Sequence, residues 1–303
     1  MQIRKISVIG AGTMGTQISL QIVRYRYDVS VYARNPEKFQ QTLEGLRDHL
    51  KNTARVPTHM FEEWEKGSKK VGLFQDLRES LQEADLVIEA LSENLPLKRK
   101  VFAQMDAFAP QRAILATTSS SIPISHIENA TRRGERCLNL HFYQRPFINN
   151  MVDIMGGTQT TADVMGAAEE FIRSIGCIPL ILKHEILGFG FARILHSMYQ
   201  HALFLWATGY VDFRDIDRGW MIFMQMPQGP FGLMDAVGLD VVYDLLMVYY
   251  NESKYPRDLP PRALKDMIER KELGRKTGRG FYTYPHPEYA RPDFLNRVEN
   301  HDT

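Results

Sequence analysis

The chain has 303 residues, of which 24% are charged and 44% hydrophobic, and this length and composition are typical of a globular protein with two domains. Its formal net charge of +1 gives no reason to expect binding to nucleic acid or to an anionic membrane. The cysteines, Cys137 and Cys177, are too few for a disulfide framework or a zinc site, so we expect no metal and a reduced, cytoplasmic location.

A glycine-rich turn follows the first predicted strand, residues 6–9, which begins so near Met1 that it leaves no room for a signal peptide. Gly10 permits the turn, Gly12 lets the backbone approach a pyrophosphate, and Gly15 lets the following helix pack closely on the strand. An ordinary strand-to-helix turn is the alternative interpretation, but this context predicts a dinucleotide site. The predicted cofactor contacts are Gly10, Gly12, Thr13, Met14 and Gly15.

The second predicted strand, residues 28–32, ends in Ala33 and Arg34. Sites for NAD usually carry an Asp or Glu here, which would bind the ribose 2′-hydroxyl and repel a 2′-phosphate. An Arg can instead pair with that phosphate, so the sequence favours NADP(H), with NAD(H) as the alternative. In the alternative case Arg34 is merely solvent-exposed, and Asn35 or the backbone holds the ribose.

Strands and helices then alternate along the chain. The helices are expected at 36–70 and 97–108, and the strands at 85–91, 113–118, 136–142, 151–155 and 178–182. This alternation predicts an α/β fold with a Rossmann-type, doubly wound parallel sheet. Residues 189–282 show only helical patterns, and Arg193 interrupts their most apolar stretch, so we expect no membrane-spanning helix. We therefore predict a dinucleotide-binding domain over 1–186 and an all-helical substrate or dimerisation domain over 187–303.

A series of motifs resembles the 3-hydroxyacyl-CoA dehydrogenase family over nearly the whole chain and in the same order. The matching segments are GAGTMG at 10–15, ADLVIEA at 84–90, ENL at 93–95, TSSS at 118–121, LHF at 140–142, GPF at 229–231 and GRKTGRGFY at 274–282. The resemblance implies hydride transfer between position 3 of an acyl thioester and a nicotinamide ring. It also implies an N-terminal dinucleotide domain and a helical C-terminal domain that forms a homodimer.

The resemblance also implies the site residues. His141 matches the family's general base, and Asp153 aligns with the Glu that orients it, although Asp is one methylene shorter. Ser120 matches the serine that hydrogen-bonds the substrate oxygen. Glu93 and Lys98 match positions that line the cofactor site. The alternative for each is a structural or solvent-exposed residue.

The chain departs from the family pattern at several positions. Thr118 replaces an Asn, and Gln144-Arg145 replaces an Asn-Pro. Ala192 stands where the family has its fourth catalytic residue, an Asn, and its methyl group cannot hydrogen-bond. Either Gln144, Arg145 or Asn149 substitutes, or the substrate has changed. An Arg soon after the base could bind a carboxylate in bidentate fashion, so Arg145 is a hypothetical contact for an acidic substrate.

The substrate therefore stays open between a CoA thioester and a free or carrier-protein-bound hydroxy acid. The residues that could bind the phosphates of coenzyme A are Lys51, Arg55, Lys66, Lys69 and Lys70, although they could equally form a solvated helix face. The alternative to an enzyme is a relative that binds the cofactor but does not catalyse a reaction. The preferred interpretation is an NAD(P)-dependent oxidoreductase of 3-hydroxyacyl thioesters.

Overall fold

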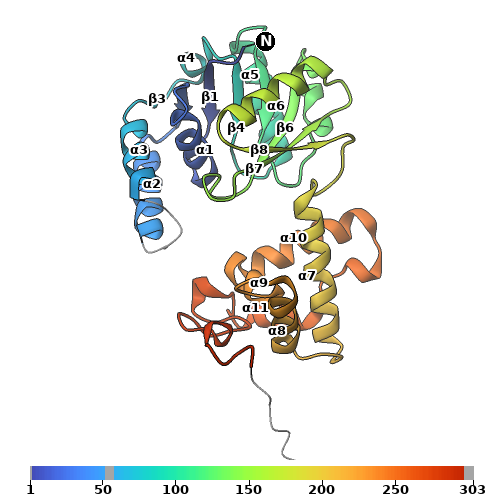
Figure 1. The fold of residues 1–303 in the computed structure, drawn as a ribbon. Coiled ribbons are helices and arrows are strands. Elements are labelled where there is room, and N and C mark those ends of the chain that lie inside the picture. Colours follow the sequence, from blue (N-terminus) through green and yellow to red (C-terminus); the bar gives the residue numbers. More distant parts are fainter. Residues whose placement is uncertain (1, 52–57, 297–303) are drawn as a thin grey trace, which may run out of the picture. The chain divides into compact units, whose positions relative to one another are not determined.

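The computed structural model describes residues 2–51 and 58–296, and the chain divides into two compact units, Met1–Gly190 and Phe191–Thr303. The first unit is an α/β domain and the second is helical (Figure 1). This confirms the predicted fold class. Over the described residues, no helix is both long enough and apolar enough to cross a membrane.

The first unit is built on an eight-stranded sheet with the order β3-β2-β1-β4-β5-β6-β7-β8. The strands are β1 (Lys5–Ile9), β2 (Asp28–Tyr32), β3 (Gly72–Phe74), β4 (Leu86–Glu89), β5 (Ile114–Thr117), β6 (Cys137–Phe142), β7 (Met151–Gly156) and β8 (Ile178–Leu182). The chain moves outward from β1 in both directions, so a topological switch point lies between β1 and β4, where open α/β sheets bind ligands.

Helices cover both faces of this sheet. The helices of this unit are α1 (Thr13–Val23), α2 (Glu37–Lys51), α3 (Thr58–Ser68), α4 (Leu77–Leu81), α5 (Leu95–Phe108) and α6 (Ala162–Ser174), of which α2 and α3 pack against α1. Helices α1 and α6 pack on one face against Val8, Ile88 and Ala116. Helices α4 and α5 pack on the other face against Val87 and Leu115. Neighbouring strand residues thus point to opposite faces, which is the period of two expected for a strand buried on both sides.

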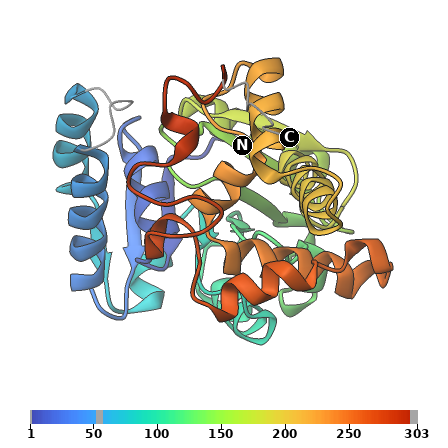
Figure 2. The same cartoon turned by 90° about the horizontal axis from the view of Figure 1, so that it is seen from below.

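The sequence prediction needs several corrections in this unit, one of which is helix α6, which was not expected. The single helix expected over 36–70 is a pair, α2 and α3, which lie side by side in Figures 1 and 2. The short elements β3 and α4 were not expected, since three and five residues are too few to show a period. Finally, β7 runs antiparallel to its neighbour β6, so the sheet is not wholly parallel. The connection between these two strands, residues 143–150, is too short for the helical crossover that parallel strands require.

The second unit contains α7 (Phe191–Ala207), α8 (Phe213–Met224), α9 (Pro230–Val237), α10 (Leu239–Ser253) and α11 (Arg262–Glu269). The chain leaves helix between α7 and α8, between α8 and α9, and between α10 and α11. The expectation of helix as far as 282 was wrong, because α11 ends at Glu269 and the chain then forms tight turns. At Gly274 the backbone has φ +90°, a conformation that favours glycine.

Two buried carboxylates hold this helical unit together. Asp217 of α8 accepts hydrogen bonds from the N–H groups of Phe231 (2.8 Å) and Gly232 (2.9 Å) at the start of α9, and from the Tyr282 hydroxyl (3.0 Å). Asp235 of α9 accepts from the N–H groups of Phe281 and Tyr282. Burial raises the pKa of Asp217 to about 6, despite the hydrogen bonds that favour its charged form.

Candidate active site

The glycine turn between β1 and α1 has the properties that a dinucleotide requires. Gly10 has φ +119°, and a Cβ on Gly15 would lie 1.9 Å from the Gly10 carbonyl oxygen, so neither position accepts a side chain without strain. By contrast, a Cβ on Gly12 would meet nothing within 4 Å. No side chain among the described residues caps the start of α1, and its first turn holds no acid. This open, positive helix end fits a pyrophosphate.

Arg34 lies at the end of β2, the strand that pairs with β1. The buried Ala33 donates its N–H to the Phe74 carbonyl (2.9 Å), and Arg34 is exposed. Within residues 2–51 and 58–296, the Arg34 guanidinium forms no hydrogen bond or ion pair. Asn35 is already engaged, since its Oδ1 accepts the N–H of Glu37 at the start of α2 (3.0 Å). Arg34 is therefore available to an anionic ligand.

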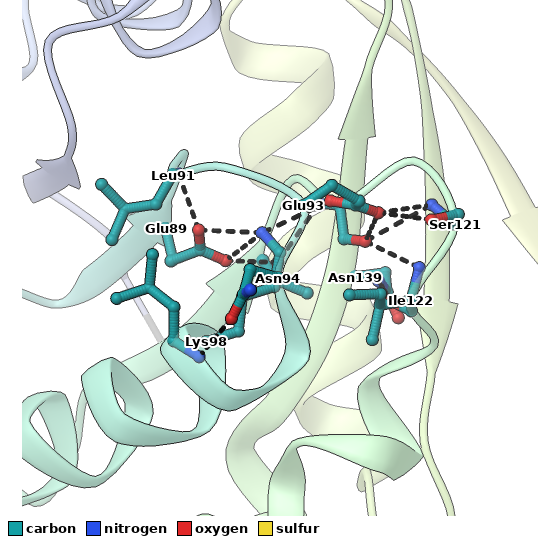
Figure 3. Close-up of polar contacts among 11 residues, drawn as sticks. Glu89, Leu91, Glu93, Asn94, Lys98, Ser121, Ile122 and Asn139 are labelled. Atoms are coloured by element: carbon teal, nitrogen blue, oxygen red, sulfur yellow. Dashed lines mark hydrogen bonds and ion pairs between the residues drawn. The ribbon is translucent and has the colours of Figure 1, made fainter. Parts of the chain in front are cut away.

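A buried ion pair lies at the carboxyl end of β4 (Figure 3). Both oxygens of Glu89 accept hydrogen bonds from Lys98 Nζ at 2.9 Å, and neither side chain is exposed to solvent. Glu89 also accepts from the Leu91 N–H and from the hydroxyl of Thr117, both at 2.6 Å. Thr117 is the register partner of Glu89 on β5, so this contact follows directly from the strand pairing.

Glu93 connects this pair to the serine loop after β5, residues 118–122. Its Oε1 accepts hydrogen bonds from the Ser119 hydroxyl and from the N–H (2.9 Å) and hydroxyl (2.7 Å) of Ser121. Its Oε2 lies 3.6 Å from Lys98 Nζ. Partial burial acts to raise the pKa of Glu93, but these bonds and the Lys98 charge outweigh it, and the net pKa is lowered. Ser120 is exposed between the two serines that Glu93 holds.

Asn139 fixes the other end of the serine loop. Its Oδ1 accepts the Ile124 N–H (2.8 Å), and its Nδ2 donates to the Ile122 carbonyl (3.1 Å). Asn139 lies two residues before His141 on β6, so both side chains point to the same face of the sheet. The strand that carries His141 therefore also positions the loop that carries Ser120.

His141 and Asp153 are cross-strand partners in the antiparallel pair β6–β7. Their atoms Nδ1 and Oδ2 lie 3.2 Å apart, and Asp153 is completely buried while His141 is 8% exposed. The short side chain of Asp153 suffices, because the register places it opposite the imidazole. With Nδ1 donating to this carboxylate, a neutral ring presents Nε2 as a proton acceptor.

Two aromatic side chains hold the imidazole in place. Phe189 stacks on His141, with ring centroids 4.5 Å apart and an interplanar angle of 14°. Tyr143 packs edge-on at 4.7 Å and donates its hydroxyl to Asp153 Oδ2 (2.7 Å). The Gly190 N–H lies 3.4 Å from Asp153 Oδ1. Asp153 is therefore oriented from several directions, as a positioning carboxylate requires.

The segment after β6 is held in an unusual conformation at Arg145. Its backbone has φ +59°, and its N–H donates to Gln17 of α1 at 2.6 Å. Its carbonyl accepts from the N–H groups of Ile148 and Asn149 (both 2.8 Å). In the part of the chain that the structure describes, the guanidinium of Arg145 has no acidic or hydrogen-bonding partner.

The lysines predicted to bind the cofactor or coenzyme A differ in their exposure to solvent. Lys98 reaches the serine loop through Glu93 and exposes no ammonium group. Lys66, Lys69 and Lys70 are exposed, whereas Arg55 and the side chain of Lys51 lie outside the described residues.

Two departures from the family pattern can also be located. Ala192 lies in the first turn of α7, and its side chain is a single methyl group. Thr118 has a buried hydroxyl without a hydrogen-bond partner among the described residues.

Several residues of the candidate site were not predicted from the sequence. Glu89, Asn139, Tyr143 and Phe189 all contribute, yet each is a single polar or aromatic residue in or next to an apolar segment. A signal was present for Glu89 and Asn139: each is a polar residue in a mostly apolar strand, and such a residue needs a buried partner. Nothing in the sequence singles out Tyr143 or Phe189.

Comparisons with known proteins match the chain over both of its units. The family model for the NAD-binding domain of 3-hydroxyacyl-CoA dehydrogenase matches residues 5–185, and the model for its C-terminal domain matches residues 188–284. A probable 3-hydroxybutyryl-CoA dehydrogenase of Bacillus subtilis is 31% identical over 94% of this chain and 98% of its own. A 5-formyl-3-hydroxy-2-methylpyridine 4-carboxylate 5-dehydrogenase of Mesorhizobium japonicum is 28% identical over 95% and 93%.

Solved structures show the same likeness. FadB2 of M. tuberculosis is 28% identical, with a TM-score of 0.85, over 94% of this chain and 100% of its own. Because both family models match consecutive parts of the chain, and a relative above 30% identity covers almost all of it, the protein is a member of the 3-hydroxyacyl-CoA dehydrogenase family of oxidoreductases.

Proposed function

We propose that this enzyme interconverts a 3-hydroxyacyl thioester and its 3-oxo form, with His141 as the general base or acid. The observation that carries the proposal is the buried His141–Asp153 pair at the carboxyl edge of the sheet, on the strand that also anchors the serine loop. With Nδ1 engaged by the carboxylate, a neutral imidazole has Nε2 as its proton-accepting atom, which a general base requires.

In this mechanism His141 Nε2 takes the proton of the substrate hydroxyl, and Asp153 stabilises the imidazolium that forms. The Ser120 hydroxyl donates to the substrate oxygen as its charge changes. The bound nicotinamide ring supplies the hydride acceptor or donor. For reduction of the 3-oxo form, the same groups act in reverse, and His141 returns the proton.

The cofactor would be held by the turn at Gly10, Gly12, Thr13, Met14 and Gly15, with Arg34 beside the adenine ribose. We propose a preference for NADP(H), because Arg34 is exposed, unpaired among the described residues and not accompanied by an acid at position 33. A 2′-phosphate would supply the partner that the guanidinium lacks there.

Titration with NADPH and NADH, followed by turnover with acetoacetyl-CoA, tests both parts. We expect the wild type to bind NADPH more tightly than NADH. Arg34→Ala should weaken NADPH binding about ten-fold and leave the affinity for NADH unchanged. Arg132→Ala is the matched control. Arg132 is also an exposed Arg, but it precedes β6 and so lies near the amino ends of the parallel strands, whereas Arg34 follows the carboxyl end of β2. Equal affinities for both cofactors in the wild type would contradict the phosphate preference. Binding without turnover of any thioester would contradict the activity.

A second candidate substrate is a free hydroxy acid, and Arg145 favours it. A non-glycine residue with positive φ is strained, and this one presents a guanidinium without a partner among the described residues, four residues after the proposed base. A substrate carboxylate would pair with it. Arg145→Ala should then raise KM for acidic substrates and leave KM for neutral ones unchanged, whereas an equal effect on both would remove this alternative.

We also propose that the protein forms a homodimer through its helical unit. That unit exposes large apolar side chains, among them Phe223 (86% exposed), Tyr210 (72%) and Ile194 (69%). Exposed apolar groups of this size are typical of surfaces that another chain covers. Sedimentation at micromolar concentration should show twice the mass of one chain, and the mass of a single chain would contradict the proposal.

A further inference from the structure

We propose that the buried pair Glu89–Lys98 is a positioning device for the serine loop, and that it acts through Glu93. Figure 3 shows Lys98 close to Glu89 and to the loop that carries Glu93. The inference rests on the proposed function, in which Ser120 contacts the substrate oxygen.

The first step concerns the fixed position of Lys98. Its ammonium group is completely buried, and both Glu89 oxygens bind it at 2.9 Å. Glu89 is fixed in turn by the Leu91 N–H and the Thr117 hydroxyl. Since β4, β5 and α5 all contribute, Lys98 Nζ is a cation held by the rigid part of the domain.

The second step concerns Glu93, which has no such support of its own. It precedes α5 in the loop after β4, and its side chain is 36% exposed. One of its oxygens, Oε2, lies 3.6 Å from Lys98 Nζ, and the other accepts three hydrogen bonds from Ser119 and Ser121. Lys98 thus fixes one oxygen, and the other oxygen fixes the loop.

The third step concerns the excess of negative charge. Glu89 alone would neutralise Lys98, so together with Glu93 the cluster carries one net negative charge. A carboxylate that is only partly neutralised is a stronger hydrogen-bond acceptor for the serine hydroxyls. Ser120, held on both sides but not itself bound to Glu93, stays free to donate to a substrate.

A double variant separates this role from simple charge compensation. Lys98→Met alone would leave Glu89 buried and unpaired and would destabilise the whole domain, so it is not informative. Glu89→Gln/Lys98→Met removes both charges together. The glutamine introduced in this variant can still accept the Leu91 N–H, and its amide can donate to the Thr117 hydroxyl, so the fold is retained.

We expect this double variant to lower kcat about ten-fold, because Ser120 remains present but is less precisely placed. In a Glu93→Gln background the same double change should alter kcat by less than about two-fold, since Lys98 then has no carboxylate to hold. Equal effects in both backgrounds, or a wild-type kcat in the double variant, would show that Lys98 only compensates Glu89.

A second readout does not depend on turnover. The amide N–H groups of Ser121 and Ile122 donate to Glu93 Oε1 and to Ser119 Oγ, so their hydrogen exchange reports on the loop. We expect faster exchange at both in Glu89→Gln/Lys98→Met. The matched control is Asp85→Asn/Arg112→Met, which removes an ion pair beside the other end of β4 and should leave this exchange unchanged.

The two readouts distinguish the possible failures. If the wild type turns over no thioester or hydroxy acid but the double variant exchanges faster at Ser121, the proposed function is wrong and the positioning role stands. If the exchange is unchanged, the positioning role is wrong whatever the activity.

Discussion

The cofactor turn allows binding and folding to be separated with two similar glycine substitutions. A Cβ on Gly12 would meet no atom within 4 Å, and the residue has ordinary extended backbone angles, so Gly12→Ala should fold normally. The added methyl would occupy the space that a pyrophosphate needs. We expect the dissociation constant for NADPH to rise at least about ten-fold, equivalent to roughly 1.4 kcal/mol.

Gly15→Ala should instead lower the stability of the fold. Its methyl carbon would lie 1.9 Å from the Gly10 carbonyl oxygen, and α1 would have to move away from β1 by about 1 Å to relieve the contact. Overpacking of this kind costs about 1–3 kcal/mol or more, and the better helix propensity of Ala offsets about 1 kcal/mol. A net loss of about 2 kcal/mol would lower the Tm by roughly 4–8 °C in a domain of this size.

Thermal unfolding and nicotinamide fluorescence titration measure the two effects on the same samples. Gly166→Ala is the matched control, because Gly166 lies inside α6 with nothing within 4 Å of its Cβ, and this change should stabilise slightly. If Gly12→Ala binds NADPH as tightly as the wild type, the cofactor does not approach this turn. A wild-type Tm for Gly15→Ala would refute the close packing of α1 on β1.

Two further predictions concern buried carboxylates. Asp153→Asn should lower kcat by about 10²-fold or more without changing cofactor affinity, since the amide no longer stabilises a protonated His141. Single-turnover rates measure this effect, and a wild-type rate would refute the role of Asp153. Asp217 has a pKa of about 6 when folded against an ordinary value of 3.8, so the folded state binds its proton more tightly than the unfolded state. Its contribution to the free energy of unfolding is therefore fully present below pH 3.8 and falls by about 3 kcal/mol as the pH rises through 6. The free energy of unfolding of the wild type minus that of Asp217→Asn, measured with urea from about pH 4 to 7, should show this fall. A difference that grows with pH would contradict the prediction.

The sequence predicted those parts of the molecule that depend on local patterns. The strand–turn–helix at 6–23 has a glycine pattern typical of a dinucleotide site, and the motifs after β4 and β5 and within β6 led to the predictions for Glu93, Ser120 and His141. Glu89 and Asn139 were missed although each is a polar residue in a mostly apolar strand, because no short pattern says where their partners lie: on α5 and β5 for Glu89, and at Ile122 and Ile124 for Asn139. The antiparallel direction of β7 was missed for the same reason, since direction is set by the length of the connection and not by the strand itself.

The cross-strand pairing of His141 with Asp153 has a consequence for how substrate range can change in this protein. The pair is fixed by the register of β6 and β7, whereas residues 144–150 lie outside both strands. We therefore expect substitutions in that connection to leave these two side chains in register. In the proposed function, a connection grafted here from a relative would change the surroundings of the substrate while His141 and Asp153 keep their pairing.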